Sequence, residues 1–282
     1  MVLDAPAKIN LALEVIGRRD DGYHELRSVF ATLELRDRVR VAPARTLDVR
    51  LSPPVSVAPG AELARRAALA LAAASGHEAR AYVRIRKRIP VAAGLGGGSS
   101  DAGTALRALA LLWDVDADLV ALGAAIGSDV PFFASGVDFA MVAGRGERVL
   151  PLPSPVVPIW IALVTLSARV PTASVFAALR EDEWSVGYAS ERLADAFRDR
   201  SVAPALVREL ARNDLLGAAE RVCPAIAEAR AVGQRRGVTL ALSGSGPTLF
   251  AVADDEGDAI RIARTLRRDG LRVRARRLGS DI

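Results

Sequence analysis

The sequence has little cysteine and no long apolar run, and both absences narrow the kinds of protein that it can encode. Its single cysteine, Cys223, excludes an internal disulfide framework and a cluster of thiolate metal ligands. No stretch approaches the roughly 18 apolar residues of a membrane-spanning helix, because the best candidate, residues 155–166, contains a proline. No charged-then-apolar signal opens the sequence. We therefore expect a cytoplasmic protein without a membrane partner.

Lysine is almost absent, although the chain is basic. Of the 38 basic residues 36 are arginine, and the only lysines are Lys8 and Lys87. Asparagine, glutamine and histidine are also scarce, which indicates a mutational pressure toward arginine, alanine, glycine and leucine. A lysine that survives such pressure indicates a position where a planar guanidinium cannot replace a compact ammonium. Chance survival is the alternative.

The apolar pattern predicts an N-terminal region of mixed strands and helices. The chain has 282 residues, of which 51% are hydrophobic, enough to bury a core in one large domain or two ordinary ones. Alternation at period two predicts strands at residues 7–15, 29–35, 39–42, 47–51 and 81–89. Helical spacing predicts helices at residues 61–74, 101–112 and 118–126.

Closely spaced prolines in Leu150–Pro155 predict a linker, because proline continues neither a helix nor a strand ladder. We therefore expect two domains, residues 1–152 and 153–282. Beyond the linker the predicted order is strand, helices, strand, strand, helix, strand, which is typical of a ferredoxin-like sheet with helical insertions. The predicted fold class is α+β, with an N-terminal mixed α/β domain, a C-terminal ferredoxin-like domain and a cleft between them.

A glycine-rich loop at residues 90–100 lies between a predicted strand and a predicted helix. Successive glycines let backbone N–H groups approach an anion, and the start of the helix adds its positive end, so the loop predicts a phosphate site. It is not a Walker A loop, because no lysine precedes Ser99. Ser99 or Ser100 is the expected N-cap of the helix. A flexible linker is the alternative.

A second small-residue loop, Ser243–Thr248, joins two predicted strands far along the chain. An ordinary glycine-rich hairpin explains it equally well. If it faces the first loop instead, the two would enclose a cleft between domains, a common place for ligands.

Asp129 introduces an acid into the apolar segment Asp129-Val-Pro-Phe-Phe. Because an unpaired buried carboxylate is costly, we expect a cation beside it, and Lys8 on the first predicted strand is the candidate. Such a pair suits a base or positioning group beside a substrate hydroxyl in phosphoryl transfer. A helix-capping aspartate is the alternative.

Tyr23-His24 follows a polar turn and could stack on and hydrogen-bond a nucleobase or sugar, although a turn histidine bonded to backbone explains it as well. Neither His24 nor His77 has the partners for a zinc site. The arginine-rich end, residues 272–277, alternates in a way that predicts a solvated edge strand, so we expect no nucleic-acid partner.

Together these motifs resemble the GHMP kinases, which carry an N-terminal Pro-x-Lys strand, a Gly-Leu-Gly-Gly-Gly-Ser-Ser-type phosphate loop and a C-terminal Gly-Ser-Gly-Pro-Thr loop. All three are present in order, from residue 5 to about residue 253. Within that superfamily, Ala5–Leu11, Asp21–Leu26 and Gly127–Phe133 are similar to the branch that acts on 4-diphosphocytidyl-2-C-methyl-D-erythritol. The departures are Ser128 for alanine, Asp101 for asparagine and Glu62-Leu63 for Asn-Leu.

The resemblance implies an activity and a set of site residues. Asp129 would take the proton from the 2-hydroxyl of the substrate, with Lys8 orienting that oxygen and Asn10 holding the same end. Tyr23 and His24 would bind the cytosine, with Phe176 as the opposite ring, and Thr172 would also bind this substrate. Lys87 would lie near the adenine entrance. The implied ATP-binding set is Lys87, Pro90, Val91, Ala92, Ala93, Gly94, Leu95, Gly96, Gly97, Gly98, Ser99, Ser100, Gly244, Ser245 and Gly246.

ATP, with Mg²⁺ as its complex, and 4-diphosphocytidyl-2-C-methyl-D-erythritol are the implied small-molecule partners, and no dedicated protein site for a metal is implied. The protein would be a monomer or a homodimer. Two alternatives stay open: a sibling kinase for another alcohol, and a non-catalytic nucleotide-binding sensor that keeps the glycine loops.

Overall fold

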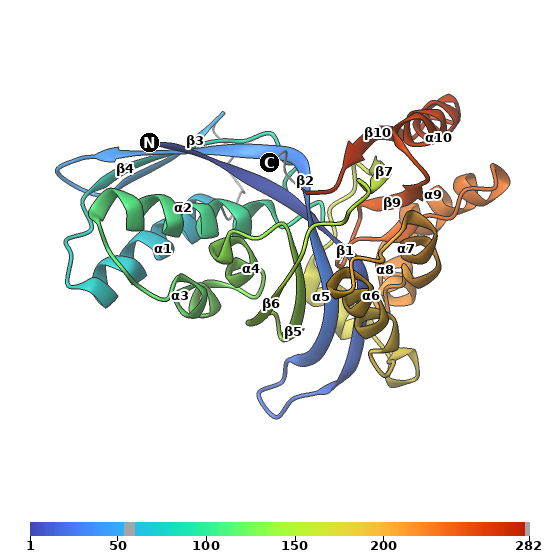
Figure 1. Ribbon diagram of the computed structural model, residues 1–282, viewed down its shortest axis with the longest axis horizontal. Helices are drawn as coiled ribbons and strands as arrows, with labels where there is room; N and C mark the ends of the chain where they lie inside the picture. The colour runs from blue at the N-terminus through green and yellow to red at the C-terminus, as the bar shows by residue number, and fades with distance from the viewer. Residues whose placement is uncertain (54–59, 280–282) are drawn as a thin grey trace.

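The computed structural model describes residues 1–53 and 60–279, and two β-sheets organise them (Figure 1). The larger sheet has the order β3-β4-β2-β5-β6, and β1 pairs with β2 beside this path. Its strands are β1 (Val2–Arg18), β2 (His24–Pro43), β3 (Asp48–Ser52), β4 (Ala81–Arg86), β5 (Phe139–Gly144) and β6 (Arg148–Leu152). All neighbours pair antiparallel except β3 and β4.

The long β1–β2 hairpin replaces three shorter predicted strands. The prediction of separate strands at 29–35 and 39–42 was wrong, because β2 runs without a break through the polar residues between them. Antiparallel pairing with β1 holds this middle part, where Pro6 lies opposite Arg36 and Ala5 opposite Asp37. The polar side chains there do not interrupt the ladder. Asp37, for example, is fully buried and accepts a hydrogen bond from the Ile89 N–H.

The N-terminal helices lie together on one side of the larger sheet, below it in Figure 1. They are α1 (Gly60–Ser75), α2 (Gly97–Trp113), α3 (Leu119–Ile126) and α4 (Val130–Ser135). Small residues on α1 and α2, including Ala64, Ala68 and Ala105, are fully buried, so the two helices pack closely against each other and under the sheet.

The second sheet has the strand order β10-β7-β9-β8, with every neighbouring pair antiparallel. In chain order this is 4-1-3-2, so the ferredoxin-like prediction is confirmed. Its strands are β7 (Trp160–Thr165), β8 (Ala241–Leu242), β9 (Leu249–Ala253) and β10 (Arg272–Arg277). The helices of this half are α5 (Thr172–Ala178), the 3₁₀ turn η1 (Glu181–Glu183), α6 (Tyr188–Arg198), α7 (Pro204–Leu210), α8 (Leu216–Val222), α9 (Pro224–Arg235) and α10 (Glu256–Arg268).

The segment between the sheets differs from the predicted linker. Its first half belongs to β6, where Pro151 lies opposite Ala140 of β5. Because β6 is the outer strand of its sheet, a proline there removes no hydrogen bond from an inner ladder. The arginine-rich β10 is likewise an outer strand, as predicted. Among the described residues, no helix is both long and apolar enough to cross a membrane.

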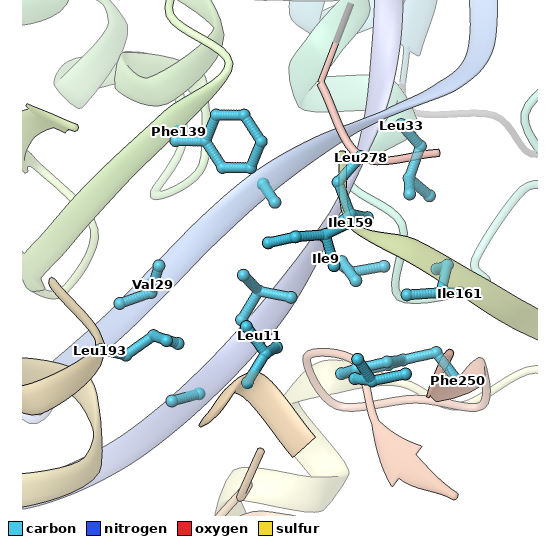
Figure 2. Packing of buried hydrophobic residues seen from close by; sticks show 14 of the residues in the cluster. Ile9, Leu11, Val29, Leu33, Phe139, Ile159, Ile161, Leu193, Phe250 and Leu278 are labelled. Atoms are coloured by element: carbon cyan, nitrogen blue, oxygen red, sulfur yellow. The ribbon is translucent and has the colours of Figure 1, made fainter. Parts of the chain in front are cut away.

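One hydrophobic core joins the two halves (Figure 2). Ile9 and Leu11 of β1 lie against Ile161 of β7 and Phe250 of β9, and all four side chains are fully buried. The β1–β2 hairpin therefore packs on the second sheet, while β2 also pairs with β4 and β5 within the first. This shared core fixes the side chains of β1 relative to the loops of both halves.

Candidate active site

A cleft of about 730 Å³ is lined by residues from both halves of the molecule. Its walls include the phosphate loop at residues 90–99, the middle and the end of β1, the Tyr23 turn, Asp129 before α4, and the residues around Thr172 and Gly244. Every predicted site residue lines this cleft except Ser100 and Gly246. The sequence motifs, which span more than 230 residues, thus converge on one cavity.

The phosphate loop runs into α2 earlier than predicted. Neither Ser99 nor Ser100 is the N-cap, because the helix begins at Gly97 after Gly96, whose φ of 67° a glycine adopts without strain. Both serines lie in the first turn, where the Ser100 N–H bonds to the Gly96 carbonyl oxygen at 2.8 Å. The N–H groups of the residues before Ser100 have no helical acceptor and are available to an anion.

The two glycine-rich loops are in direct contact. The Thr248 N–H donates to the Ala93 carbonyl oxygen at 3.3 Å, and the Ser243 hydroxyl donates to the Gly94 carbonyl oxygen at 3.3 Å. A Cβ added at Gly94 would lie 2.7 Å from the Gly246 carbonyl oxygen. The second loop is therefore more than a connection between β8 and β9, since it closes the cleft over the first loop.

Lys8 and Asp129 form an ion pair at the centre of the cleft. Lys8 Nζ lies 3.2 Å from Asp129 Oδ2, and the side chains are 5% and 31% exposed, so the carboxylate faces the cavity while the ammonium lies behind it. The Lys8 N–H also donates to the Leu95 carbonyl oxygen at 3.0 Å, which fixes β1 to the phosphate loop. Asp129 stands at the N-cap position of α4 but makes no capping bond, so its carboxylate is free for a ligand.

Asn10 holds the ammonium of Lys8 from the side. Lys8 Nζ donates to Asn10 Oδ1 at 2.8 Å, and Asn10 Nδ2 donates to the Ser28 hydroxyl at 2.9 Å. The ammonium also lies 4.1 Å from the centre of the Phe30 ring, a favourable position for a cation. This chain of contacts leaves Lys8 little freedom and orients it toward Asp129.

Several aromatic side chains lie together at one end of the cleft. The His24 ring stacks on Phe176 with centroids 5.1 Å apart and planes at 28°, and Trp184 meets His24 edge-on at 6.0 Å. Tyr23 is 51% exposed beside them. Thr172 lies near the second glycine loop, with its hydroxyl 2.9 Å from that of Ser245. Burial, with a contribution from Arg18, lowers the pKa of His24, so at neutral pH its ring offers one donor and one acceptor.

Trp184, which the sequence did not indicate, contacts the His24 ring but does not itself line the cleft. It follows the 3₁₀ turn η1 in a stretch without clear periodicity, and only its contact with His24 places it here.

Lys87 lies under the phosphate loop, where two carboxylates hold it. Its ammonium bonds to Asp37 Oδ2 at 2.5 Å and Asp101 Oδ2 at 2.6 Å, and both acids are fully buried. Asp37 also accepts the N–H groups of Arg88 and Ile89, the latter at 2.9 Å. Asp37, Lys87 and Asp101, which we call the loop clamp, therefore tie the start of the loop to the first turn of α2.

The loop clamp changes the interpretation of three residues. Lys87 does line the cleft, but its hydrogen bonds go to acids, so an adenine contact for its ammonium stays a prediction. Asp101, which departs from the asparagine of the family pattern, is one of the two acids in this buried ion cluster. Asp37 was not predicted at all, because it falls in the gap between two predicted strands. Both lysine side chains of the chain are thus largely buried and paired with carboxylates at the cleft.

The loop clamp makes stability depend on pH. Burial, reinforced by the Asp37 carboxylate and partly offset by Lys87, raises the pKa of Asp101 from its ordinary 3.8 to about 7. At pH values between 3.8 and about 7, Asp101 is protonated in the folded protein and ionised in the unfolded chain. The contribution of Asp101 to the free energy of unfolding is therefore lost as pH rises toward 7. We expect wild type to lose stability relative to Asp101→Asn between pH 5 and pH 8 in urea unfolding. If the stabilities of wild type and Asp101→Asn differ by the same amount at pH 5 and at pH 8, the assignment is contradicted.

Comparisons with known proteins agree with this arrangement. The chain matches the family descriptions "GHMP kinases N terminal domain" over residues 62–137 and "GHMP kinases C terminal" over residues 193–271. A protein of Thermus thermophilus named 4-diphosphocytidyl-2-C-methyl-D-erythritol kinase is 39% identical over 267 residues, which are 93% of this chain and 91% of that protein. One of the same name from Dehalococcoides mccartyi is 35% identical over 277 residues, 96% of this chain and 95% of that protein.

A solved structure is similar over its whole length. The crystal structure of a 4-(cytidine 5'-diphospho)-2C-methyl-D-erythritol kinase shares 37% identity, covers 100% of both chains and superimposes with a TM-score of 0.81. The two-sheet fold and the cleft between its glycine loops are those of a GHMP kinase. Within that class, the chain belongs to the 4-diphosphocytidyl-2-C-methyl-D-erythritol kinase family.

Proposed function

We propose that this chain transfers the γ-phosphate of ATP to the 2-hydroxyl of 4-diphosphocytidyl-2-C-methyl-D-erythritol, giving the 2-phosphate and ADP in the non-mevalonate pathway to isoprenoids. The observation that carries the proposal is the Lys8–Asp129 ion pair, which lies between a phosphate loop and an aromatic pocket in one cleft. A kinase for a cytidyl alcohol needs these three elements within the reach of one substrate.

The catalytic step in this proposal rests on Asp129 and Lys8. The Asp129 carboxylate accepts the proton of the 2-hydroxyl as its oxygen attacks the γ-phosphorus, and the bond to the β-phosphate oxygen breaks. Lys8 lies 3.2 Å from that carboxylate and stabilises the charge on the attacking oxygen. Asn10 fixes the ammonium through a 2.8 Å hydrogen bond. Most of the rate enhancement then comes from positioning and electrostatics, because the loose transition state requires little covalent chemistry from the protein.

The phosphates of ATP bind to the loop at residues 90–100. Free N–H groups at the start of α2 and the positive end of that helix favour a polyphosphate. The apolar side chain of Leu63 lines the same end of the cleft and is suited to the adenine ring. Gly244 covers Lys8 from the other half, where an added Cβ would lie 3.9 Å from Lys8 Nζ. The nucleotide is thus enclosed by both glycine loops.

Oxygen donors in the cleft fit a magnesium ion bound to ATP. Such an ion keeps phosphate oxygens and several waters, so it needs only one or two oxygens from the protein. Ser99 lines the cleft and could supply one of them. When bound, the ion neutralises charge on the transferring phosphate. No cluster of three acidic, histidine or cysteine ligands occurs among residues 1–53 and 60–279.

The aromatic pocket binds the cytosine, and replacement of Tyr23 tests this assignment. We expect Tyr23→Ala to raise KM for the cytidyl substrate by about 10- to 100-fold, because stacking of a base on an aromatic ring contributes about 1 to 3 kcal/mol. KM for ATP should stay within a factor of about two. Steady-state kinetics with each substrate varied in turn would measure both. The reverse pattern would mean that the two nucleotides occupy each other's pockets.

The proposed reaction is tested by ADP release from Mg-ATP with 4-diphosphocytidyl-2-C-methyl-D-erythritol, run in parallel with mevalonate, homoserine and galactose. Turnover with the first alone is the expected result. Turnover with another alcohol would replace the substrate and keep the kinase. No turnover with any of them, from a protein that binds ATP, would favour a nucleotide sensor.

A further inference from the structure

The proposed acceptor carries a diphosphate between its cytidine and the alcohol that is phosphorylated. With the base at Tyr23 and His24 and the reacting hydroxyl at Asp129, this diphosphate must cross the cleft between those residues. Its two negative charges lose part of their hydration there, so a cation is needed along that path.

Four basic side chains line the cleft among the described residues, and two of them are already neutralised. Lys8 is paired with Asp129, and Lys87 is paired with two buried carboxylates. The other two, Arg18 and Arg145, both lie near the aromatic end. Arg18 is exposed at the end of β1, opposite His24 in the strand register, and so lies at the outer side of the base pocket.

Arg145 connects the aromatic end to the catalytic acid. It belongs to the tight turn between β5 and β6, and its guanidinium lies 5.2 Å from the centre of the Tyr23 ring. Its Nη2 donates to the Ala124 carbonyl oxygen of α3 at 3.1 Å, which anchors the side chain. The next residue, Gly146, packs so closely on Ser128 that a Cβ there would overlap the Ser128 carbonyl oxygen. Arg145 is therefore held between Tyr23 and the segment that ends at Asp129.

The guanidinium is still available to a ligand. Of its five N–H groups, one is used by a hydrogen bond within the described residues. Asp21 makes its hydrogen bonds to Arg19 and to the Tyr23 N–H, and the charge of Arg145 acts on it without a hydrogen bond between the two side chains. Glu147 accepts the backbone N–H of Arg145 at 2.7 Å, which shapes the turn without using the guanidinium.

We propose that Arg145 binds the diphosphate of the cytidyl substrate and thereby selects a nucleoside diphosphate ester over an uncharged nucleoside or a free alcohol. The inference rests on the proposed function, because that function supplies the positions of the base and of the reacting hydroxyl. The planar fork of a guanidinium suits two phosphate oxygens, and its position over Tyr23 lets one side chain contact the base platform and the charged bridge together.

Binding of two probes tests this role without catalysis. Affinities of cytidine and cytidine 5'-diphosphate are measured by calorimetry with saturating ADP present, so that the phosphate loop is occupied. Wild type should bind the diphosphate about 10- to 100-fold more tightly than cytidine, the range for hydrogen bonds to a charged group. Arg145→Gln should remove most of that preference and leave cytidine affinity within a factor of about three, while Arg145→Lys should keep part of it.

Arg148→Gln is the matched control, since it removes the same charge from the same hairpin at an exposed side chain outside the cleft, paired with Glu25. It should leave both affinities unchanged. The inference is overturned if Arg145→Gln keeps the preference, or if it weakens cytidine and cytidine 5'-diphosphate equally, which would mean that Arg145 only supports Tyr23. Wild-type protein that binds neither probe would overturn the proposed substrate itself, a result distinct from the other two.

Discussion

Replacing Asp129 by alanine is expected to lower kcat by about 10²- to 10⁴-fold, the range for loss of a positioned general base. The carboxylate is 31% exposed to the cleft and makes no helix-capping bond, so its removal should leave α4 in place. KM for ATP should change little, because the phosphate loop holds the nucleotide independently. Single-turnover kinetics at saturating substrates would measure the chemical step directly.

A variant of a second acid separates an effect on catalysis from an effect on folding. Asp116→Ala removes an exposed carboxylate outside the cleft and should leave kcat unchanged. Asp129→Asn keeps the shape of the side chain but cannot accept the proton, so it should be nearly as slow as the alanine variant. Near-normal turnover by folded Asp129→Ala would refute the role of this residue as the base.

The second large effect is expected at the contact between the two glycine loops. Gly94 has φ near 74°, and a Cβ there would lie 2.7 Å from the Gly246 carbonyl oxygen and 2.8 Å from that of Ser243. Neither backbone group can rotate away, so Gly94→Ala must push the loops apart. We expect kcat/KM for ATP to fall by at least about 100-fold, because a shift of about 1 Å in a positioning group has an effect of that size.

Gly270→Ala is the control for backbone strain alone. Gly270 also has a positive φ, near 86°, but an added Cβ there would have no neighbour within 4 Å. Both variants should lose roughly 1 to 2 kcal/mol of stability from the left-handed backbone conformation. Only Gly94→Ala should also lose ATP turnover, and equal kinetic losses in the two variants would contradict a closed loop contact.

Features with a strong local signal were predictable from the sequence. The glycines at 94–98, the order of the C-terminal elements and the scarcity of lysine each have a direct physical meaning, and each led to a residue or a topology that the structure contains. The Lys8–Asp129 contact was expected from the cost of a buried acid, and the structure shows it at 3.2 Å, although the buried partner is Lys8 and the Asp129 side chain is 31% exposed. Such inferences succeed because one residue type at one place restricts the chemistry.

Features that depend on distant partners were not predictable. Asp37 has an unremarkable local sequence, and only the fold brings it within hydrogen-bonding distance of Lys87, 50 positions away. The start of α2 was placed too late because glycines are poor helix formers, yet residues 97 and 98 are helical through packing on the rest of the domain. β6 was hidden by Pro151, which an outer strand tolerates.

The position of the new phosphate tests the central claim most directly. Wild-type protein is incubated with Mg-ATP and 4-diphosphocytidyl-2-C-methyl-D-erythritol, and the product is examined by ³¹P NMR with coupling to the carbon skeleton. The account predicts one new phosphomonoester on the 2-oxygen, an intact cytidine diphosphate and one ADP for each product formed. Phosphate on a different hydroxyl, or cleavage of the cytidine diphosphate, would contradict it.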